Sequence, residues 1–409
     1  MKLNTTCNSI DFDDFVLKHN LVHYTKTSMW AQNKNNEGTP VYLGFVDNNQ
    51  LIGTALAFKR KWHNKTYFYI PWGPCLNTNN LEQFKEALQL CIQYARKENA
   101  FFLRTDFNIQ RVSRDIDGNQ IDGINNEHIT ELLKEIGFKH KGYGYAYNGS
   151  WVNRYTLIAN LDKPLDEILK SYHKARQTAI KRHSIIGVTT HLATQSEISY
   201  LMEFEKELAE IQGFKPHTRT YFENIMDSFK DHARFYITEI DLKQMVAGLD
   251  EEIHSKKYAK DKEALASKEK EYNEAVSLHS KYGDNVVIAA GLFLYVGNTS
   301  YDLYTYNRKE FNFVKPVDNL HYFAMNDMKN LGVLKYDMCG FSGVTNSDDP
   351  YYGLYSYKKS FGSEFTEYIG EFDYILNVKN YTHFIKSIKL KGKIKRKLNS
   401  ILYKKKNLK

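Results

Sequence analysis

The chain has 409 residues, of which 42% are hydrophobic and 25% are charged, and its formal net charge is +8. This length predicts two domains rather than a single core, and the ordinary charge content excludes wholesale disorder. Eleven lysine and arginine residues and no acidic residue lie between Lys386 and Lys409, so the rest of the chain is nearly neutral and a uniformly basic nucleic-acid-binding surface is excluded.

Cysteine spacing and hydropathy indicate the compartment. The four cysteines are scattered without a CxxC pair, which argues against a metal site or a disulfide framework and suits a reducing environment. No apolar stretch follows Met1, and no run of residues approaches the length of a membrane span. We therefore expect a cytoplasmic protein without a signal peptide.

Strand-like and helix-like stretches alternate through the first part of the chain. Apolar and β-branched runs around turn residues predict strands, and apolar residues at 3–4 spacing predict helices. The expected elements are a hairpin over 41–46 and 51–56, a strand over 66–70, a helix over 81–99, a buried strand over 100–106 and a helix over about 127–136.

The later part of the chain shows a similar order of elements. We expect a hairpin over 289–296 and 301–306, a helix over 320–331 and a strand over 332–337. One helix–strand unit ends at Asp106 and the other at Asp337, which indicates two related α/β subdomains. Chance similarity between two generic units is the alternative.

Residues 239–285 interrupt this plan with a highly charged stretch that is rich in Lys, Glu and Ala. Narrow apolar seams at 3–4 spacing predict two antiparallel helices that form a short coiled-coil arm, with a turn at 256–261. One long helix is the alternative. Such an arm could contact a partner or act as a solvated spacer.

Several local motifs stand in a defined order from about Trp30 to Gly370, and together they resemble the FemABX family of non-ribosomal peptidyltransferases. Each motif alone is unspecific, whereas their order and spacing are specific. The motifs are Trp30 to Lys34 (W-x-x-x-K), Tyr69 to Pro74 (Y-I-P-R-G-P, with Trp72 in place of Arg), Arg104 to Asp106, the helix from Ser171 to Gly187, Gly340 to Gly343 (G-x-S-G), Gly353 to Gly362 (L-Y-x-F-K-x-x-F-G) and Glu367 to Gly370.

The resemblance implies an α/β (α+β) fold of two acetyltransferase-like (GNAT-type) domains with an inserted helical arm. We expect the first domain over 1–150, the second over 151–238 and 286–377, the arm over 239–285 and a basic C-terminal tail over 378–409. The implied activity is transfer of Gly, Ala or Ser from aminoacyl-tRNA to the stem peptide of a lipid-linked or UDP-linked peptidoglycan precursor.

Acyl transfer from an already activated ester requires positioning, proton removal and oxyanion stabilisation. We therefore expect no cofactor and no metal. The chain lacks the R/Q-x-x-G-x-G/A loop with which GNAT enzymes hold coenzyme A, which argues against an acetyl-CoA-dependent acetyltransferase. A protein that binds or deacylates aminoacyl-tRNA is a further alternative.

The resemblance identifies Lys358 and Asp106 as candidate catalytic residues. Lys358 is the first lysine of a motif that lies near the reaction centre in the family. Asp106 ends a buried strand and could accept a proton or orient the acceptor amine. The structural alternatives are a surface lysine at a helix end and an aspartate that caps a turn.

Six further residues are candidate binding residues. Lys34 and Arg219 are expected to grip the diphosphate of the acceptor, with His217 as a substitute for Arg219, and Tyr357 is expected to contact substrate. Arg176, Lys181 and Arg182 lie on one basic helix that could contact tRNA or phosphate, or form a solvated face.

The basic tail carries interspersed apolar residues. This pattern suits contact with the anionic inner membrane surface, which would bring the enzyme to a lipid-linked acceptor. Contact with tRNA and a disordered, solubilising end are the alternatives.

Overall fold

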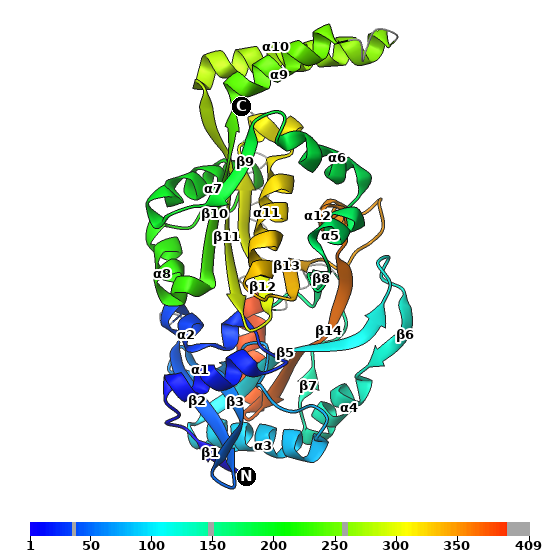
Figure 1. Ribbon diagram of the computed structural model, residues 1–409. Coiled ribbons are helices and arrows are strands. Elements are labelled where there is room, and N and C mark those ends of the chain that lie inside the picture. Colours follow the sequence, from blue (N-terminus) through cyan, green and yellow to red (C-terminus); the bar gives the residue numbers. More distant parts are fainter. Residues whose placement is uncertain (35–37, 146–150, 256–260, 391–409) are drawn as a thin grey trace.

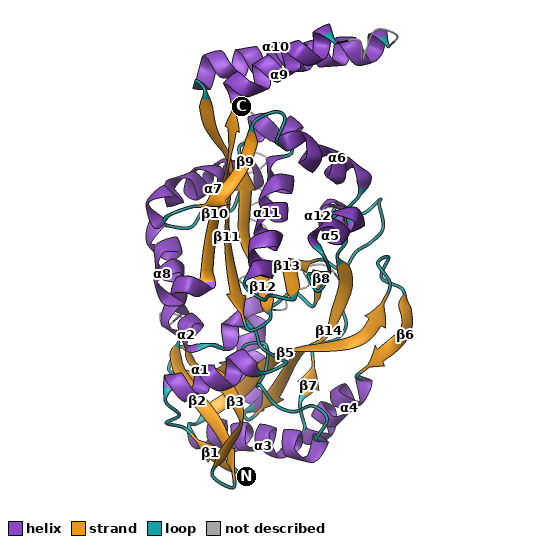
Figure 2. Cartoon of the chain, viewed as in Figure 1, coloured by secondary structure: helices purple, strands orange, loops and turns teal. Residues whose placement is uncertain are grey.

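The computed structural model describes residues 1–34, 38–145, 151–255 and 261–390, apart from the side chain of Lys34. It shows an elongated body of two halves, from one end of which a pair of helices projects (Figure 1). Strands run through the centre of the body and helices cover them (Figure 2).

The first half contains the N-terminal elements. They are β1 (Lys2–Asn4), α1 (Ser9–Lys18), η1 (Tyr24–Lys26), α2 (Ser28–Lys34), β2 (Thr39–Asp47), β3 (Gln50–Trp62), β4 (Lys65–Ile70), α3 (Leu81–Lys97), β5 (Ala100–Arg114), β6 (Gln120–Asn125), α4 (Glu127–Ile136) and β7 (Lys139–His140). Each predicted strand and helix of this part is confirmed. The strand predicted over 100–106 extends further because β5 pairs with β6 and β14 beyond that point.

The second half contains the remaining elements. They are β8 (Tyr155–Asn160), α5 (Leu165–Ser171), α6 (Lys174–His183), β9 (Val188–Leu192), η3 (Gln195–Glu197), α7 (Ile198–Gln212), α8 (Arg219–Phe229), η4 (Lys230–His232), β10 (Ala233–Asp241), α9 (Leu242–His254), α10 (Lys262–Tyr282), β11 (Asn285–Val296), β12 (Thr299–Asn307), η6 (Lys309–Val314), α11 (Pro316–Asn330), β13 (Lys335–Phe341), α12 (Tyr352–Lys359) and β14 (Glu364–Ile375).

One continuous sheet connects the two halves. Within the described ranges it has 14 strands, and its main path runs β1-β2-β3-β4-β5-β14-β8-β13-β12-β11-β10-β9. Strand β14, which comes last in the chain, pairs antiparallel with β5 of the first half and, at its start, with β8. The domain division at residue 150 therefore stays a prediction, because the sheet does not break there.

The two halves share one pattern of strand pairing. Strands β4 and β5 pair parallel, and α3 connects them; strands β12 and β13 also pair parallel, and α11 connects them. Asp106 and Asp337 both lie on the second strand of their β-α-β unit, on β5 and on β13. The internal repeat expected from the sequence therefore corresponds to a repeated structural unit.

Alternating residues of the central strands pack into different cores. In β10, Phe235 and Ile237 pack with α7 and α8, whereas Tyr236 packs with α11 on the opposite face. The core on the first of these faces also includes Phe12 of α1 and residues of β3, so it spans both halves. This shared core stabilises the relative position of the halves through buried apolar area.

The charged insertion forms two packed helices, α9 and α10, as predicted, and a small core that contains Met245, Leu249 and Ala275 ties them to β10 and β11. The predicted turn lies almost wholly outside the described residues. Arg182 of α6 pairs with Glu271 of α10 at 2.7 Å, so the arm is also connected to the body by an ion pair.

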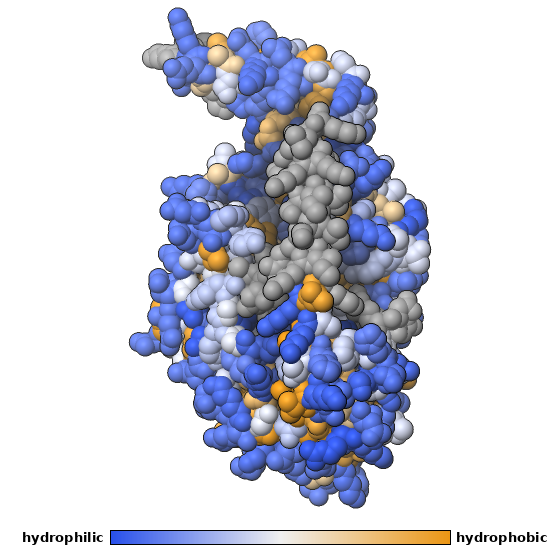
Figure 3. Space-filling model, turned by 180° about the vertical axis from the view of Figure 1, so that it is seen from behind, coloured by the Kyte–Doolittle hydropathy of each residue, from blue (hydrophilic) through white to orange (hydrophobic). Residues whose placement is uncertain are grey.

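The predicted basic tail starts with a helix over residues 378–390 that packs against the first half. Tyr381 and Phe384 are buried beside Phe101 and Phe102, and the Tyr381 hydroxyl donates to Asp373 at 2.6 Å. Hydrophilic residues predominate on the face shown in Figure 3, where hydrophobic residues form small separate patches. Over the described ranges, every helix is too short or too polar to cross a bilayer.

Candidate active site

Helix α12 turns Lys358 towards the interior. The side chain is buried, and its Nζ atom donates to the main-chain oxygens of Cys339 at 2.9 Å and of Gly340 at 3.0 Å. Cys339 has a φ of 61°, a left-handed conformation that is costly for a residue other than glycine. The irregular backbone of β13 at this point therefore presents two carbonyl groups to one buried ammonium group.

Two carboxylates lie near this ammonium group. Asp337 accepts hydrogen bonds from the Thr156 hydroxyl and, at 2.7 Å, from the main-chain N–H of Cys339, and burial raises its pKa. Burial also raises the pKa of Asp302 to about 6, although the nearby Lys358 acts in the opposite direction. The site therefore combines one cation with two carboxylates that are easier to protonate than exposed ones.

A buried histidine positions the hydroxyl of Tyr357, the residue next to Lys358. His321 lies 2.7 Å from the Tyr336 hydroxyl through Nδ1 and 2.8 Å from the Tyr357 hydroxyl through Nε2. Burial lowers the pKa of His321 to about 3, so the ring is neutral and can donate to one tyrosine while accepting from the other.

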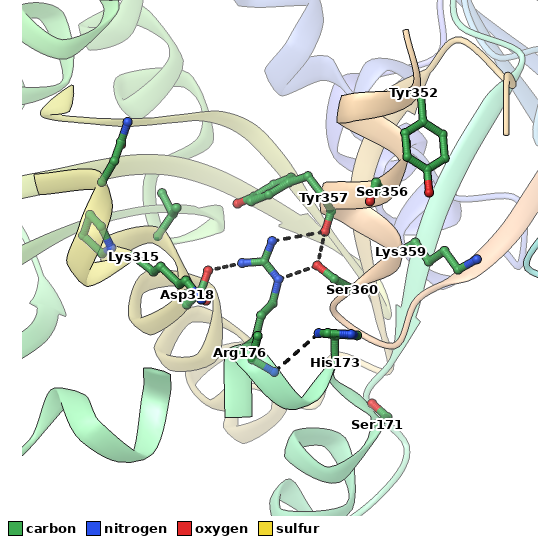
Figure 4. A pocket seen from close by; sticks show the side chains of 14 residues that line it. Ser171, His173, Arg176, Lys315, Asp318, Tyr352, Ser356, Tyr357, Lys359 and Ser360 are labelled. Atoms are coloured by element: carbon green, nitrogen blue, oxygen red, sulfur yellow. Dashed lines mark hydrogen bonds and ion pairs between the residues drawn. The ribbon is translucent and has the colours of Figure 1, made fainter. Parts of the chain in front are cut away.

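A cavity of about 730 Å³ lies on the outer side of α12 and contains three cationic side chains, Arg176, Lys315 and Lys359 (Figure 4). Arg176 points between Asp318 and Ser360 and donates to both. Asp318 is buried, and its second oxygen has no hydrogen-bond partner among the described residues. This cavity therefore offers an excess of positive charge.

A second cavity, of about 440 Å³, lies between the two halves. Residues 20–23, which precede η1, and residues of β5 line one side, and residues of β8, β12, β13 and β14 line the other. The lining includes His23, Asn108, Tyr301, Asp337 and Tyr368. Lys358 lies on α12, beside the first cavity, and bonds to β13, which carries Asp337 beside the second cavity. It therefore connects the walls of the two cavities.

Asp106 lies on β5, in the first half. Its carboxylate accepts hydrogen bonds from the Tyr69 hydroxyl at 2.8 Å and from the main-chain N–H of Trp72. Burial raises the pKa of Asp106 to about 7. Trp72 has a φ of 57°, so the hydrogen bond from its N–H to Asp106 supports a strained turn. Asp106 is also a titratable group near neutral pH.

The structure places Lys34 and Arg219 on neighbouring helices. Lys34 ends α2, Arg219 begins α8, and these two helices pack together across the halves. Arg219 is about half exposed and pairs with Glu223 at 2.7 Å. The His217 ring lies 2.6 Å from the buried Glu205. The side chain of Lys34 lies outside the described part of the structure.

The three predicted basic contacts on α6 do not form one patch. Arg176 points into the first cavity, Arg182 pairs with the arm, and Lys181 is exposed. Helical spacing alone could not show this, because the partners Asp318 and Glu271 are distant in the sequence.

Three chemically notable residues had no signal in the sequence. Asp302 and His321 join Lys358 only through the packing of β12, α11 and α12. Lys26 is buried and donates to Leu21 and Asn108 at 2.8 Å each, and burial lowers its pKa to about 8. Only the long-range folding of the chain brings these groups together.

The protein is an acyltransferase with a mixed α/β fold. The sequence pattern of the FemAB family matches residues 7–387, so the chain belongs to this family. The predicted family and enzyme class are thereby confirmed.

The chain is similar to known proteins over almost its whole length. It is 26% identical to a protein named lipid II:glycine glycyltransferase from Staphylococcus aureus (strain bovine RF122 / ET3-1), over 95% of this chain and 97% of the relative. The protein of the same name from Staphylococcus aureus (strain USA300) is 25% identical with the same coverage. The crystal structure of FemX superposes with a TM-score of 0.77 at 24% identity, over 93% of this chain and 99% of that chain, which confirms the predicted fold.

Proposed function

We propose that the protein transfers an aminoacyl group from aminoacyl-tRNA to the stem peptide of a lipid-linked peptidoglycan precursor. The observation that carries this proposal is the similarity, over 95% of the chain, to relatives named lipid II:glycine glycyltransferase. Because those relatives are named for glycine, glycine is the first candidate for the transferred residue, ahead of alanine and serine.

The cavity around Arg176 suits the donor. Arg176, Lys315 and Lys359 can hold phosphate groups, and the rings of Tyr352 and Tyr357 offer faces on which a base can stack. Asp318 neutralises part of this charge and fixes the direction of the Arg176 guanidinium. We assign this cavity to the acceptor end of the tRNA.

The cavity between the halves suits the acceptor. Both halves line this cavity. Helix α2 of the first half carries Lys34, helix α8 of the second half carries Arg219, and these two helices pack together. Two cations from separate elements can hold a diphosphate in one orientation. We assign the stem peptide to this cavity and the diphosphate to Lys34 and Arg219.

In the proposed reaction, the acceptor amine attacks the ester carbonyl of the donor. A nitrogen–carbon bond forms, the ester carbon–oxygen bond breaks, and the ribose hydroxyl of the tRNA leaves with a proton. Two of the three Lys358 donors are bonded to carbonyls of described residues, which leaves one to stabilise the oxyanion. Asp106, whose pKa is raised to about 7, is the proposed acceptor of the ammonium proton.

The test is an assay with lipid II and with tRNA charged separately with labelled Gly, Ala or Ser. Label should enter the lipid fraction, RNase treatment should abolish the transfer, and Lys358→Met should reduce it. Release of free amino acid without transfer would indicate a deacylase, and modification of an amine by acetyl-CoA would indicate an acetyltransferase. Either result would contradict the proposal.

We also place the protein at the cytoplasmic face of the membrane. The helix over residues 378–390 carries Lys379, Lys386 and Lys389 on its exposed surface and has no acidic residue, and further lysines follow it in the sequence. Cations attract anionic lipid headgroups. The full chain should sediment with phosphatidylglycerol vesicles at low salt and not at 0.5 M salt; absence of binding at low salt would contradict this location.

A further inference from the structure

Four buried charged side chains lie together where β5 and β14 pair antiparallel (Figure 1). The register places Arg104 opposite Asp373 and Asp106 opposite Glu371. Residues two apart on a strand point to the same face, so all four side chains share one face of the sheet. They are 0–3% exposed. We call these four residues the charged block; it contains one cation and three carboxylates.

The cation of the charged block is bonded mainly to one of the three carboxylates. Nε and one terminal nitrogen of Arg104 donate to the two oxygens of Asp373 at 2.7 and 2.8 Å. The other terminal nitrogen lies 3.3 Å from Glu371. Bidentate pairs of this kind are strong and fix the direction of the guanidinium. Asp373 therefore limits how far Arg104 can neutralise the other two carboxylates.

The helix over residues 378–390 supports this arrangement from outside. The Tyr381 hydroxyl donates to Asp373 at 2.6 Å, and the Phe384 ring packs 5.1 Å from that of Phe102. Phe102, Arg104 and Asp106 alternate along one face of β5. The helix therefore covers the face that carries the charged block and keeps water away from it.

Asp106 and Glu371 are two carboxylates in directly opposite positions. Such positions place the Cβ atoms about 4.5–5.5 Å apart, so two negative charges repel one another. Each carboxylate also accepts one main-chain N–H, that of Trp72 for Asp106 and that of Trp151 for Glu371. Burial raises the pKa of both carboxyl groups; Glu371 raises that of Asp106 further, whereas Arg104 lowers both.

Other titratable groups face these two carboxylates from the neighbouring elements. They are Lys26 of η1, Tyr69 of β4, Lys141 after β7, Asp373 of β14 and Tyr381 of the helix over residues 378–390. The Tyr69 hydroxyl donates to Asp106 at 2.8 Å, and burial raises its pKa well above the usual value, so it stays neutral near pH 7. Lys26 donates its printed bonds to Leu21 and Asn108.

We propose that Glu371 and Arg104 are positioning residues that act on Asp106 in opposite directions, and that Asp373 restrains Arg104 so that Asp106 remains a useful base. This inference rests on the proposed function, in which Asp106 accepts the ammonium proton of the acceptor. An ordinary aspartate is a weak base near neutral pH, and an opposing carboxylate strengthens it. The proton passes from the acceptor nitrogen to Asp106, while Glu371 and Arg104 neither gain nor lose one.

The first measurement is kcat for glycyl transfer to lipid II between about pH 5.5 and pH 8.5. In the wild type, kcat should fall on the acid side as Asp106 becomes protonated. Glu371→Gln removes the opposing charge and should move this acid limb to lower pH by about one pH unit. Arg104→Gln should move it to higher pH. A merely structural role would lower kcat without shifting the limb in opposite directions.

Infrared titration of the full chain without substrate follows the same proton directly. The carbonyl band of protonated Asp106 is the band that Asp106→Asn removes. This band should vanish at lower pH in Glu371→Gln and at higher pH in Arg104→Gln than in the wild type. Asp373→Asn should act like Glu371→Gln, because it removes a negative charge and releases Arg104.

Glu127→Gln is the matched control. Glu127 also pairs with an arginine, Arg111 at 2.5 Å, and accepts from the Tyr143 hydroxyl at 2.8 Å, but it lies on α4 outside the charged block. This variant should leave the band and the acid limb unchanged. Thermal unfolding by circular dichroism identifies variants that fail to fold; Glu371→Asp, which keeps the charge and should retain part of the wild-type behaviour, and Asp373→Asn then carry the test.

The two readouts separate this inference from the proposed function. If the wild type transfers glycine but the band and the limb of Glu371→Gln stay at the wild-type pH, or shift in the same direction as those of Arg104→Gln, the inference fails and the proposed function stands. If the band shifts as expected but the wild type transfers nothing, the proposed function fails and the control of the Asp106 charge by Glu371 and Arg104 stands.

Discussion

The Nζ atom of Lys358 lies 2.9 Å from the main-chain oxygen of Cys339, a residue whose φ of 61° turns that carbonyl towards the lysine. A buried ammonium group is stable only when its donors are bonded, and the irregular backbone of β13 supplies the acceptors. The strain at Cys339 and the burial of Lys358 therefore depend on one another, and both belong to the wall between the two cavities.

Replacement of Lys358 by methionine should lower kcat at least 100-fold, because the oxyanion would lose its nearest cation. The free energy of unfolding should fall by about 1–3 kcal/mol, because two buried carbonyl groups lose their donor. Transfer kinetics and denaturant unfolding measure the two effects. Lys329→Met is the control: Lys329 also donates to a carbonyl, that of Leu161 at 3.0 Å, but lies outside the cavities, so kcat should change less than twofold. An unchanged kcat in Lys358→Met would contradict the catalytic role.

Asp106→Asn should change how stability depends on pH. Burial raises the pKa of Asp106 from 3.8 to about 7, so between these values the native protein keeps a proton that the unfolded chain releases. The wild type should therefore lose stability as the pH rises from about 4 to about 7, by up to about 4 kcal/mol, and the asparagine variant should not.

Guanidinium unfolding at pH 4.5, 6 and 7.5 measures this difference. Asp122→Asn on β6, which replaces an exposed carboxylate, is the control for the loss of one negative charge. A constant difference for Asp106→Asn would show that Asp106 is already ionised at acidic pH.

The pair of Arg176 and Asp318 should behave as a coupled unit. Arg176→Gln leaves a buried carboxylate without its cation and should destabilise the protein by about 3 kcal/mol. Asp318→Asn in the same chain should restore most of this loss, because no uncompensated charge then remains. A double-mutant cycle of unfolding free energies gives the coupling, and the coupling for the exposed pair of Lys170 and Asp166 should be much smaller. Additive effects at Arg176 and Asp318 would contradict the coupling.

Lys34→Gln and Arg219→Gln should each raise the KM for lipid II about tenfold, the cost of one charge-assisted hydrogen bond, with kcat unchanged. The KM for aminoacyl-tRNA should stay the same. Arg219 is half exposed and, among the described residues, pairs with Glu223 of its own helix, so thermal stability should not change. Lys206→Gln on the neighbouring α7 is the control for loss of one surface charge. Equal effects on both substrates would argue against diphosphate binding.

Local sequence patterns predicted part of the fold, and no prediction covered α1, α7, α8, β10 or β14. The periodicity of residues 81–99 and the alternation around residues 41–56 predicted α3, β2 and β3, because a helix or hairpin is set largely by neighbours in the chain. The family motifs also identified Lys358 and Asp106, and both are buried. Whether these two residues act in catalysis is a matter for the kinetic tests above.

By itself, the sequence determined the predicted hairpins and helix–strand units, the charged insertion and the family. Only the tertiary structure decided which residues meet. Pairing of β14 with β5, the contact of Arg176 with Asp318 and the grouping of Asp302 and His321 with Lys358 each join segments far apart in the chain. Such contacts depend on complementary packing of whole elements, and the raised pKa values of Asp106 and Asp302 exist only because that packing removes water from their carboxylates.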